Sequence, residues 1–255
     1  MLQAMALLNP EQLTGRSRAH VRESRELQCT LHPDAARAFT ALREAAQAAG
    51  LEPAAASGFR DFERQLTIWN DKYHGRRPLL DRQGEPLDPH VMTASQIVPA
   101  ILQWSALPGA SRHHWGTEID VIDRAALGEG QQPRLVPAEY AGDGIFAPLE
   151  RWLAEHAESF GFFRPYDRDR GGVQPEPWHL SYAPIAATAL PALTLPVLRA
   201  ALEDIDLAGA EAVAPLLPEI HARYVLAVAM PSKQALAAPR LRKPRRRFSP
   251  ATRPS

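Results

Sequence analysis

Hydrophobic and polar positions follow a helical period over several stretches of the chain. Residues 32–50 carry apolar side chains on one face, including Phe39 and Leu42, and Gly50 follows as a stop signal. Three further stretches show the same period: residues 61–74, 93–104 and 147–160. Beyond Pro184, shorter amphipathic stretches interrupted by prolines predict a series of short helices.

An alternating, β-branched pattern over residues 117–123 (TEIDVID) predicts the clearest strand of the chain. Shorter strands are expected within residues 51–60 and 176–183. The segment between residues 75 and 89 is rich in Pro, Gly and charge, so it is predicted to be a surface loop. Helices segregated from a few strands, which we expect to be antiparallel, are typical of the α+β class.

Length and composition predict a folded domain with a sizeable core and no disulfide. The chain has 255 residues, of which 45% are hydrophobic. Its single cysteine, Cys29, has no second thiol to pair with and cannot build a sulfur-rich zinc site. Any metal site must therefore be built from His, Asp and Glu side chains.

Positive charge is concentrated at the C-terminal end. The formal net charge is zero, but residues 233–255 hold eight Lys or Arg and no acid, which leaves 21 basic and 29 acidic side chains in residues 1–232. We predict a folded domain over residues 1–232, with helical additions at both ends, and a basic, disordered tail over residues 233–255. The tail either contacts a polyanion or is only a solvated segment. Nucleic acid is not the expected partner, because Phe248 is the tail's only aromatic residue.

The sequence contains no convincing signal for export or membrane insertion. The apolar patch of residues 1–8 is preceded by no Lys or Arg, and Asn9 and Pro10 end it. No other stretch approaches the length of a transmembrane helix. As it stands, the sequence predicts a cytoplasmic protein, and a periplasmic or cell-wall location stays open if the N-terminus is incomplete.

The segment SRHHWGTEID (residues 111–120) concentrates groups that can bind a metal. Side chains alternate across a strand, so Glu118 and Asp120 share one face of the predicted strand. An ionised carboxylate in such a poorly solvated place must be paired or bound to a metal. His113 lies in the preceding loop, and Gly116 allows that loop to turn back towards Asp120.

A second predicted strand supplies His179, three residues after Glu176. Two histidines and one aspartate would hold a zinc ion and leave one tetrahedral position open for water, as in catalytic sites. Glu176 is then placed to exchange a proton with that water. The simpler interpretation is that these side chains only form hydrogen bonds in an inactive fold, in which Glu176 would have no role.

Three motifs resemble those of the VanY-type D-alanyl-D-alanine carboxypeptidases, a zinc peptidase group that also includes lysostaphin-like enzymes and the hedgehog signalling domain. The motif S-x-H-x-x-G-x-x-x-D is met by Ser111, His113, Gly116 and Asp120. The motif E-x-W-H is met by Glu176, Trp178 and His179. The motif S-x-[YF]-R with a glutamine five residues on is met by Ser57, Phe59, Arg60 and Gln65. The resemblance spans about residues 57–182 and does not cover the basic tail.

The resemblance implies a small antiparallel sheet that carries the zinc site and is flanked by helices. It implies that Zn²⁺ is held by His113, Asp120 and His179. It also implies that Glu176 is the general base and that Arg60 stabilises negative charge on the substrate carbonyl oxygen. Substrate contacts are assigned to Ser57, Gln65, Ser111 and Trp178.

Two features of the motif region depart from the family or are unusual. Glu118 stands where the family usually has alanine, and it either orients a ligand histidine or points into the substrate cleft. His114 lies beside His113. We expect His114 and Trp115 to form the cavity wall or to pack, because a fourth protein ligand would close the catalytic position.

These observations predict a zinc carboxypeptidase that removes a terminal D-alanine from peptidoglycan stem peptides or muropeptides. Two alternatives remain open. A peptidoglycan endopeptidase would use the same chemistry in a cleft open at both ends, whereas a carboxypeptidase needs a positive group that captures a free terminal carboxylate. A non-catalytic, zinc-containing binding module would hold the metal without turnover.

Overall fold

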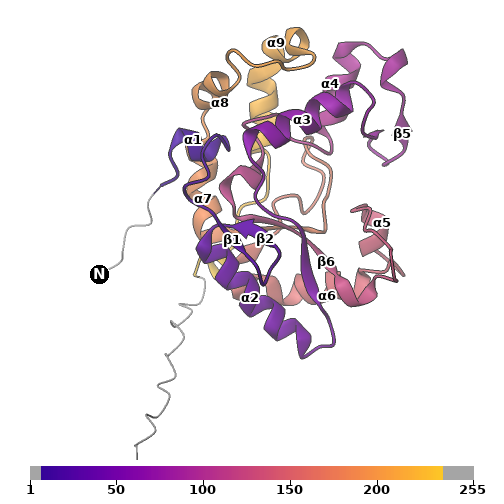
Figure 1. Ribbon diagram of the computed structural model, residues 1–255, viewed down its shortest axis with the longest axis vertical. Coiled ribbons are helices and arrows are strands. Elements are labelled where there is room, and N and C mark those ends of the chain that lie inside the picture. Colours follow the sequence, from indigo (N-terminus) through magenta and orange to yellow (C-terminus); the bar gives the residue numbers. More distant parts are fainter. Residues whose placement is uncertain (1–6, 238–255) are drawn as a thin grey trace, which may run out of the picture.

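A four-stranded antiparallel sheet organises the described residues, 7–237, of the computed structural model (Figure 1). Its strands run in the order β3 (Pro53–Ser57), β6 (Glu118–Asp123), β8 (His179–Tyr182) and β7 (Phe162–Phe163). All six residues of β6 are buried, because β6 pairs with β3 on one side and with β8 on the other. The predicted α+β class and antiparallel strands are confirmed.

The sheet register brings the predicted ligands together. Asp120 pairs directly with His179 across β6 and β8, and with Ser57 across β6 and β3. A register shift between Ala55 and Ser57 marks a bulge at the end of β3, just before the turn that leads to Arg60. Three segments that are far apart in the sequence therefore meet at Asp120, on the central strand β6.

Two short hairpins form separate two-stranded sheets. One joins β1 (Arg22–Ser24) to β2 (Cys29–Leu31), and the other joins β4 (Leu79–Leu80) to β5 (Pro86–Leu87). The second hairpin corrects the prediction of a surface loop over residues 75–89. Its strands are only two residues long and Leu79 is its buried anchor, so Pro, Gly and charge dominate the sequence pattern there.

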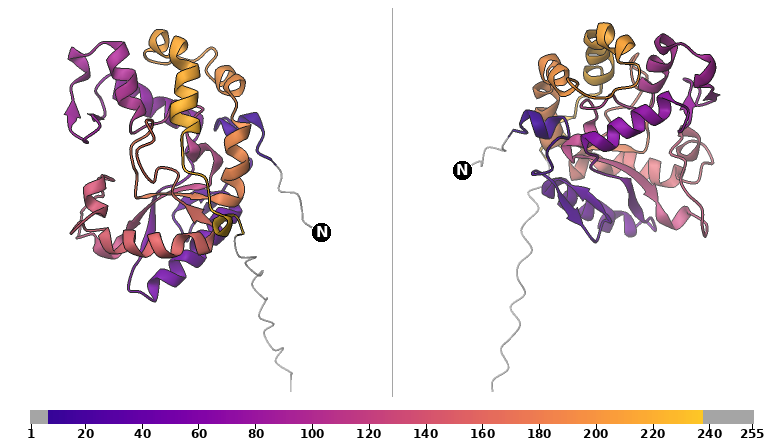
Figure 2. Two further views of the ribbon diagram at one scale, coloured as in Figure 1. Left: turned by 180° about the vertical axis from the view of Figure 1, so that it is seen from behind. Right: turned by 45° about the horizontal axis from the view of Figure 1, so that its top comes forward.

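The helices form two groups around the sheet (Figures 1 and 2). In Figure 1, α2 and α6 lie below the sheet, and α3, α4, α8 and α9 lie above it. The longer helices are α2 (Pro33–Gln47), α3 (Phe62–Tyr73), α4 (Ala94–Leu102), α6 (Ala147–His156), α7 (Ala183–Ala192), α8 (Leu195–Ala201) and α9 (Ala210–Ile220). Shorter ones are α1 (Pro10–Leu13), α5 (Pro137–Tyr140) and α10 (Lys233–Leu236), and a π-helical turn covers His221–Leu226.

The predicted amphipathic faces form the core. In α2, Phe39 and Leu42 are fully buried, as their helical spacing predicts, and the Phe39 ring packs edge-on against Phe162 of the sheet. Trp69 of α3 is also fully buried, and its indole nitrogen donates a hydrogen bond to the Ala208 carbonyl. This contact ties α3 to the segment before α9.

The C-terminal part of the predicted tail is outside the described residues. The short helix α10 occupies Lys233–Leu236, and Ala235 is buried in the main core, so the described fold continues past residue 232. Residues 238–255, which hold most of the basic tail, are not described. Within residues 7–237 no single helix is long and apolar enough to cross a membrane, and only the α7–α8 pair, bent by 83°, meets the criterion jointly.

Candidate metal centre

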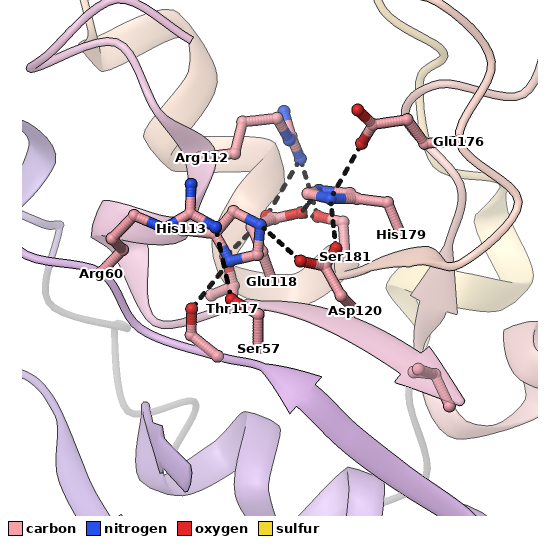
Figure 3. A network of polar contacts seen from close by, with 12 residues as sticks. Ser57, Arg60, Arg112, His113, Thr117, Glu118, Asp120, Glu176, His179 and Ser181 are labelled. Atoms are coloured by element: carbon pink, nitrogen blue, oxygen red, sulfur yellow. Dashed lines mark hydrogen bonds and ion pairs between the residues drawn. The ribbon is translucent and has the colours of Figure 1, made fainter. Parts of the chain in front are cut away.

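Three buried side chains converge on one point over the two central strands of the sheet, β6 and β8 (Figure 3). They are His113, Asp120 and His179, and one ligand atom from each lies within 4.8 Å of the others. The His113 Nε2 atom lies 3.4 Å from Asp120 Oδ2, and the His179 Nδ1 atom lies 3.1 Å from Asp120 Oδ1. Zinc bonds of about 2.0–2.1 Å place tetrahedral ligand atoms roughly 3.3–3.4 Å apart, so this donor set fits a zinc ion.

The turn at Gly116 brings His113 back to the sheet. Gly116 adopts a left-handed conformation with φ of 68° and ends the helical turn Arg112–Trp115. A Cβ atom at this position would lie 2.3 Å from a Val21 methyl carbon and 2.9 Å from the His32 backbone nitrogen. Glycine is therefore required both by the backbone conformation and by this close approach.

Hydrogen bonds on the far side of each imidazole decide which nitrogen faces the metal. The His113 Nδ1 atom donates to the Gly58 carbonyl oxygen at 2.7 Å, which leaves Nε2 free. The His179 Nε2 atom donates to the Glu118 carboxylate at 2.8 Å, which leaves Nδ1 directed at Asp120 and Glu176. Such partners fix the tautomer and the orientation of ligand histidines.

The electrostatics of the site also favour a cation. Burial would raise the pKa of Asp120, but His113, His179 and Arg60 hold it at about 2, so this carboxylate stays ionised. Burial lowers the pKa of His113 to about 4, which keeps its imidazole neutral, as a metal ligand must be. For His179, burial lowers the pKa, but the hydrogen bonds with Asp120 and Glu118 raise it to about 10, so its Nδ1 proton must be displaced when a metal binds.

Glu176 faces the same point but lies outside the ligand set. Its Oε2 atom is 3.4 Å from His179 Nδ1 and its side chain lines the adjoining cavity. Burial raises the pKa of Glu176 to about 7, against the opposing effect of His179. A carboxyl group with this pKa can accept and return a proton near neutral pH.

Arg60 is held over the site by two side chains and by the backbone. Its guanidinium donates to Gln65 Oε1 at 2.8 Å and to Ser57 Oγ at 3.3 Å. Its backbone N–H donates to the His113 carbonyl at 3.2 Å, and its own carbonyl accepts a hydrogen bond from His114 Nδ1 at 2.7 Å. The segment before α3 and the loop before β6 therefore hold each other in place.

Two predicted substrate contacts are corrected by this arrangement. Gln65 is fully buried and does not line the cavity, because its oxygen accepts from Arg60 and its amide nitrogen donates to the Ala106 carbonyl at 2.6 Å. Ser57 likewise contacts Arg60 and does not line the cavity. Ser111 and Trp178 do line it.

His114 and Trp115 are packing residues in the core, which is one of the two roles expected for them. Both side chains are fully buried and neither lines the cavity. His114 Nε2 accepts a hydrogen bond from the Gly109 N–H at 3.2 Å, and the Trp115 indole donates to the Leu13 carbonyl at 3.2 Å. No fourth protein ligand comes from this pair.

Glu118 lies behind His179 rather than in the substrate cleft, which decides between its two proposed roles. It is fully buried and does not line the cavity. One of its oxygens accepts from His179, and the other accepts from Ser181 at 2.8 Å, from Thr117 at 2.9 Å and from Arg112 at 3.3 Å (Figure 3). Burial raises its pKa, but Arg112 and His179 lower it to about 2, so it is ionised.

We expect Glu118→Ala to weaken zinc binding by about 10- to 100-fold, because the hydrogen bond that orients His179 is lost. Competition with a chelator of known zinc affinity measures this change. Glu52→Ala, which removes an exposed carboxylate, serves as the matched control and should leave the affinity unchanged. An unchanged affinity in a folded Glu118→Ala protein would contradict the role assigned to Glu118.

The site adjoins a cavity of about 650 Å³. One wall comes from α3 and the β4–β5 hairpin, and the opposite wall includes residues 134–138. The metal ligands, Arg60 and Glu176 line its floor. The cavity therefore gives a peptide access to all the predicted catalytic groups.

Three cavity residues were not predicted from the sequence: Arg112, Tyr166 and Lys72. Arg112 could have been suspected, because a buried Glu118 requires a cation nearby. Lys72 follows Gln65 by seven positions, so helical spacing places both on one face of α3. No pattern marks Tyr166, whose ring lies 4.9 Å from the His179 ring through tertiary contact alone.

Comparison with known proteins identifies relatives of this chain. A family model described as "VanY: D-alanyl-D-alanine carboxypeptidase" matches residues 28–185. An uncharacterized protein of Haemophilus influenzae is 36% identical over 122 residues, which cover 47% of this chain and 93% of that protein. A D-alanyl-D-alanine carboxypeptidase of Enterococcus faecalis is 30% identical over 149 residues, which cover 57% of this chain and 46% of that protein.

Solved structures with a similar backbone include two VanY proteins. VanYB in complex with D-alanine-D-alanine has a TM-score of 0.48 at 23% identity, with 74% of this chain and 91% of that chain covered. A mutant VanY D,D-pentapeptidase in complex with Zn(II) has a TM-score of 0.45 at 24% identity, with 76% and 88% covered. The family model alone matches 158 of the 255 residues, a range that contains every site residue described above.

Proposed function

The chain belongs to the VanY family of D-alanyl-D-alanine carboxypeptidases, and from this premise we propose that it is a zinc-dependent carboxypeptidase that removes a terminal D-alanine from peptidoglycan stem peptides. The observation that carries the proposal is the convergence of a His-Asp-His donor set with Glu176 and Arg60 on one cavity. A merely structural metal site would have no use for either of the last two residues.

His113, Asp120 and His179 would hold the zinc ion. When bound, zinc supplies a Lewis acid that polarises a carbonyl group and lowers the pKa of water. The three side chains come from one turn and two paired strands, so their positions are fixed by backbone hydrogen bonds before any metal binds. This preorganisation limits the conformational entropy lost on metal binding.

Glu176 acts as the proton carrier. Its carboxylate takes a proton from the attacking water and later gives it to the nitrogen of the leaving D-alanine. A pKa of about 7 suits both steps near neutral pH. Because the attack uses water, no serine or cysteine nucleophile is required.

Arg60 stabilises the transition state. Its guanidinium is always protonated and is held in place by Gln65 and Ser57. It is therefore ready to interact with the carbonyl oxygen as negative charge develops there, without having to reorganise.

Mass spectrometry of purified stem peptides, incubated with the zinc-loaded protein, tests this proposal. We expect the pentapeptide to lose one alanine, and Glu176→Ala to abolish the loss. Loss of alanine from the tetrapeptide instead would assign L,D-specificity. Internal cleavage would favour an endopeptidase, and the absence of any cleavage would favour a non-catalytic zinc module.

A further inference from the structure

The cationic side chains of the catalytic cavity differ in whether they already have partners. Five line it: Arg60, Lys72, Arg77, Arg112 and Arg134. Arg60 is held by Gln65 and Ser57, and the Arg112 guanidinium donates to Glu118 and to Ser181 and lies 4.6 Å above the Trp115 ring. Arg60 is already assigned to the substrate carbonyl oxygen. The charge of Arg112 is paired with Glu118, although its Nε and Nη1 atoms have no hydrogen-bond partner among the described residues.

The remaining three cations lie nearer the mouth of the cavity or on α3. Arg77 pairs with Asp71 at 3.5 Å, and Arg134 is exposed at the rim. Lys72 is half-buried in the last turn of α3, and within residues 7–237 its ammonium forms no ion pair or hydrogen bond with any side chain. A half-buried cation without a partner is unfavourable, and an anion that enters the cavity would relieve this.

Lys72 lies close to the reacting groups. Burial is the main cause that lowers its pKa, to about 8, while the charge of Glu176 raises the pKa and the charges of Arg60 and Arg77 lower it further. The terminal carboxylate of a peptide is one residue away from the last peptide bond, a span of at most about 3.6 Å along the chain. Lys72 lines the same cavity as Glu176 and Arg60, so a peptide whose last bond lies at these two residues presents its terminal carboxylate to the cavity wall that Lys72 forms.

We propose that the Lys72 ammonium binds the free terminal carboxylate of the peptide substrate and thereby selects cleavage of the last residue. This inference rests on the proposed carboxypeptidase function. It makes Lys72 a specificity-determining residue, because an internal peptide bond offers no carboxylate at that position. The other possible role of Lys72, tuning the Glu176 proton affinity, would act on every substrate alike.

The test compares a peptide ending in D-Ala-D-Ala with the same peptide carrying a C-terminal amide. For Lys72→Met we expect the KM for the free acid to rise by about 10- to 100-fold, the range for a lost hydrogen bond between charged groups. We expect kcat for the acid, and both constants for the amide, to change by less than about 3-fold. Lys233→Met, which removes an exposed lysine that does not line the cavity, should leave kcat and KM for both substrates unchanged.

A charge-conserving variant adds a pH signature. The Lys72 ammonium lines the same cavity as Glu176, Arg60 and Arg77, whose charges act on it, and it is charged only below its pKa of about 8. The wild-type KM for the acid should therefore rise above pH 8. At pH 7, Lys72→Arg should have a KM for the free acid close to the wild-type value. Its KM should not rise above pH 8, because an arginine stays charged.

Three results would overturn the inference. Equal loss of activity on acid and amide would mean that Lys72 acts through Glu176, and no change in Lys72→Met would place the carboxylate elsewhere. If the wild type cleaves neither peptide, the proposed function fails, and calorimetry of the D-Ala-D-Ala dipeptide with wild type and Lys72→Met still decides whether Lys72 binds a carboxylate. Equal binding to both proteins would then reject it.

Discussion

Glu176→Gln should lower kcat for D-alanine release by about 10²- to 10⁴-fold, the usual contribution of a general acid–base group. Glutamine has the same shape as glutamate but cannot accept a proton from the attacking water. KM should stay within a few-fold of the wild-type value, because Glu176 is not assigned a contact with the peptide ends. Steady-state kinetics on a pentapeptide stem, with the zinc content measured on the same sample, checks this.

The zinc content separates this role from metal binding. Glu176 is outside the His113, Asp120 and His179 set, so Glu176→Gln should retain one zinc per chain. Glu85→Gln is the matched control, because Glu85 is an exposed acid on the wall of the same cavity. It should change kcat by less than about 2-fold. A decrease of less than 10-fold in Glu176→Gln would assign the proton transfer to another group.

The clustering of His113, Asp120 and His179, with Glu176 beside them, could be predicted because their positions depend on local spacing. Asp120 and His179 lie on short strands whose alternation is visible in the sequence, and Gly116 marks the turn that returns His113 to them. What spacing does not reveal is the pairing of those strands. The direct opposition of Asp120 and His179 follows from the β6–β8 register, which depends on contacts between segments 59 positions apart.

The supporting residues could not be predicted, because their roles depend on partners that are distant in the sequence. Gln65 is predicted to contact the substrate from a helix. Its amide nitrogen instead donates a hydrogen bond to the Ala106 carbonyl, 41 positions away. Arg112 donates a hydrogen bond to Ser181, 69 positions away, a partner that the sequence does not indicate. Tertiary contacts of this kind leave no periodic signal.

The Arg112–Glu118 pair predicts a large effect on stability. Both side chains are almost completely buried, so removing one partner leaves the other charge without compensation. Arg112→Met should therefore lower the free energy of unfolding by about 3–5 kcal/mol. Denaturant unfolding in the presence of a chelator measures this loss without the contribution of bound metal.

An exposed ion pair provides the comparison. Arg37 pairs with Asp34 on the surface of α2, so Arg37→Met should cost less than about 1 kcal/mol. If the Arg112 effect comes from an uncompensated Glu118 charge, the double variant Arg112→Met, Glu118→Gln should be more stable than Arg112→Met alone. If the double variant is instead less stable by the sum of the two single effects, the loss comes from packing over Trp115 and not from the ion pair. Arg112 would then stabilise the site through its packing contacts and not through its charge. The hydrogen bond between Glu118 and His179 would be the remaining link between this network and the zinc ligands.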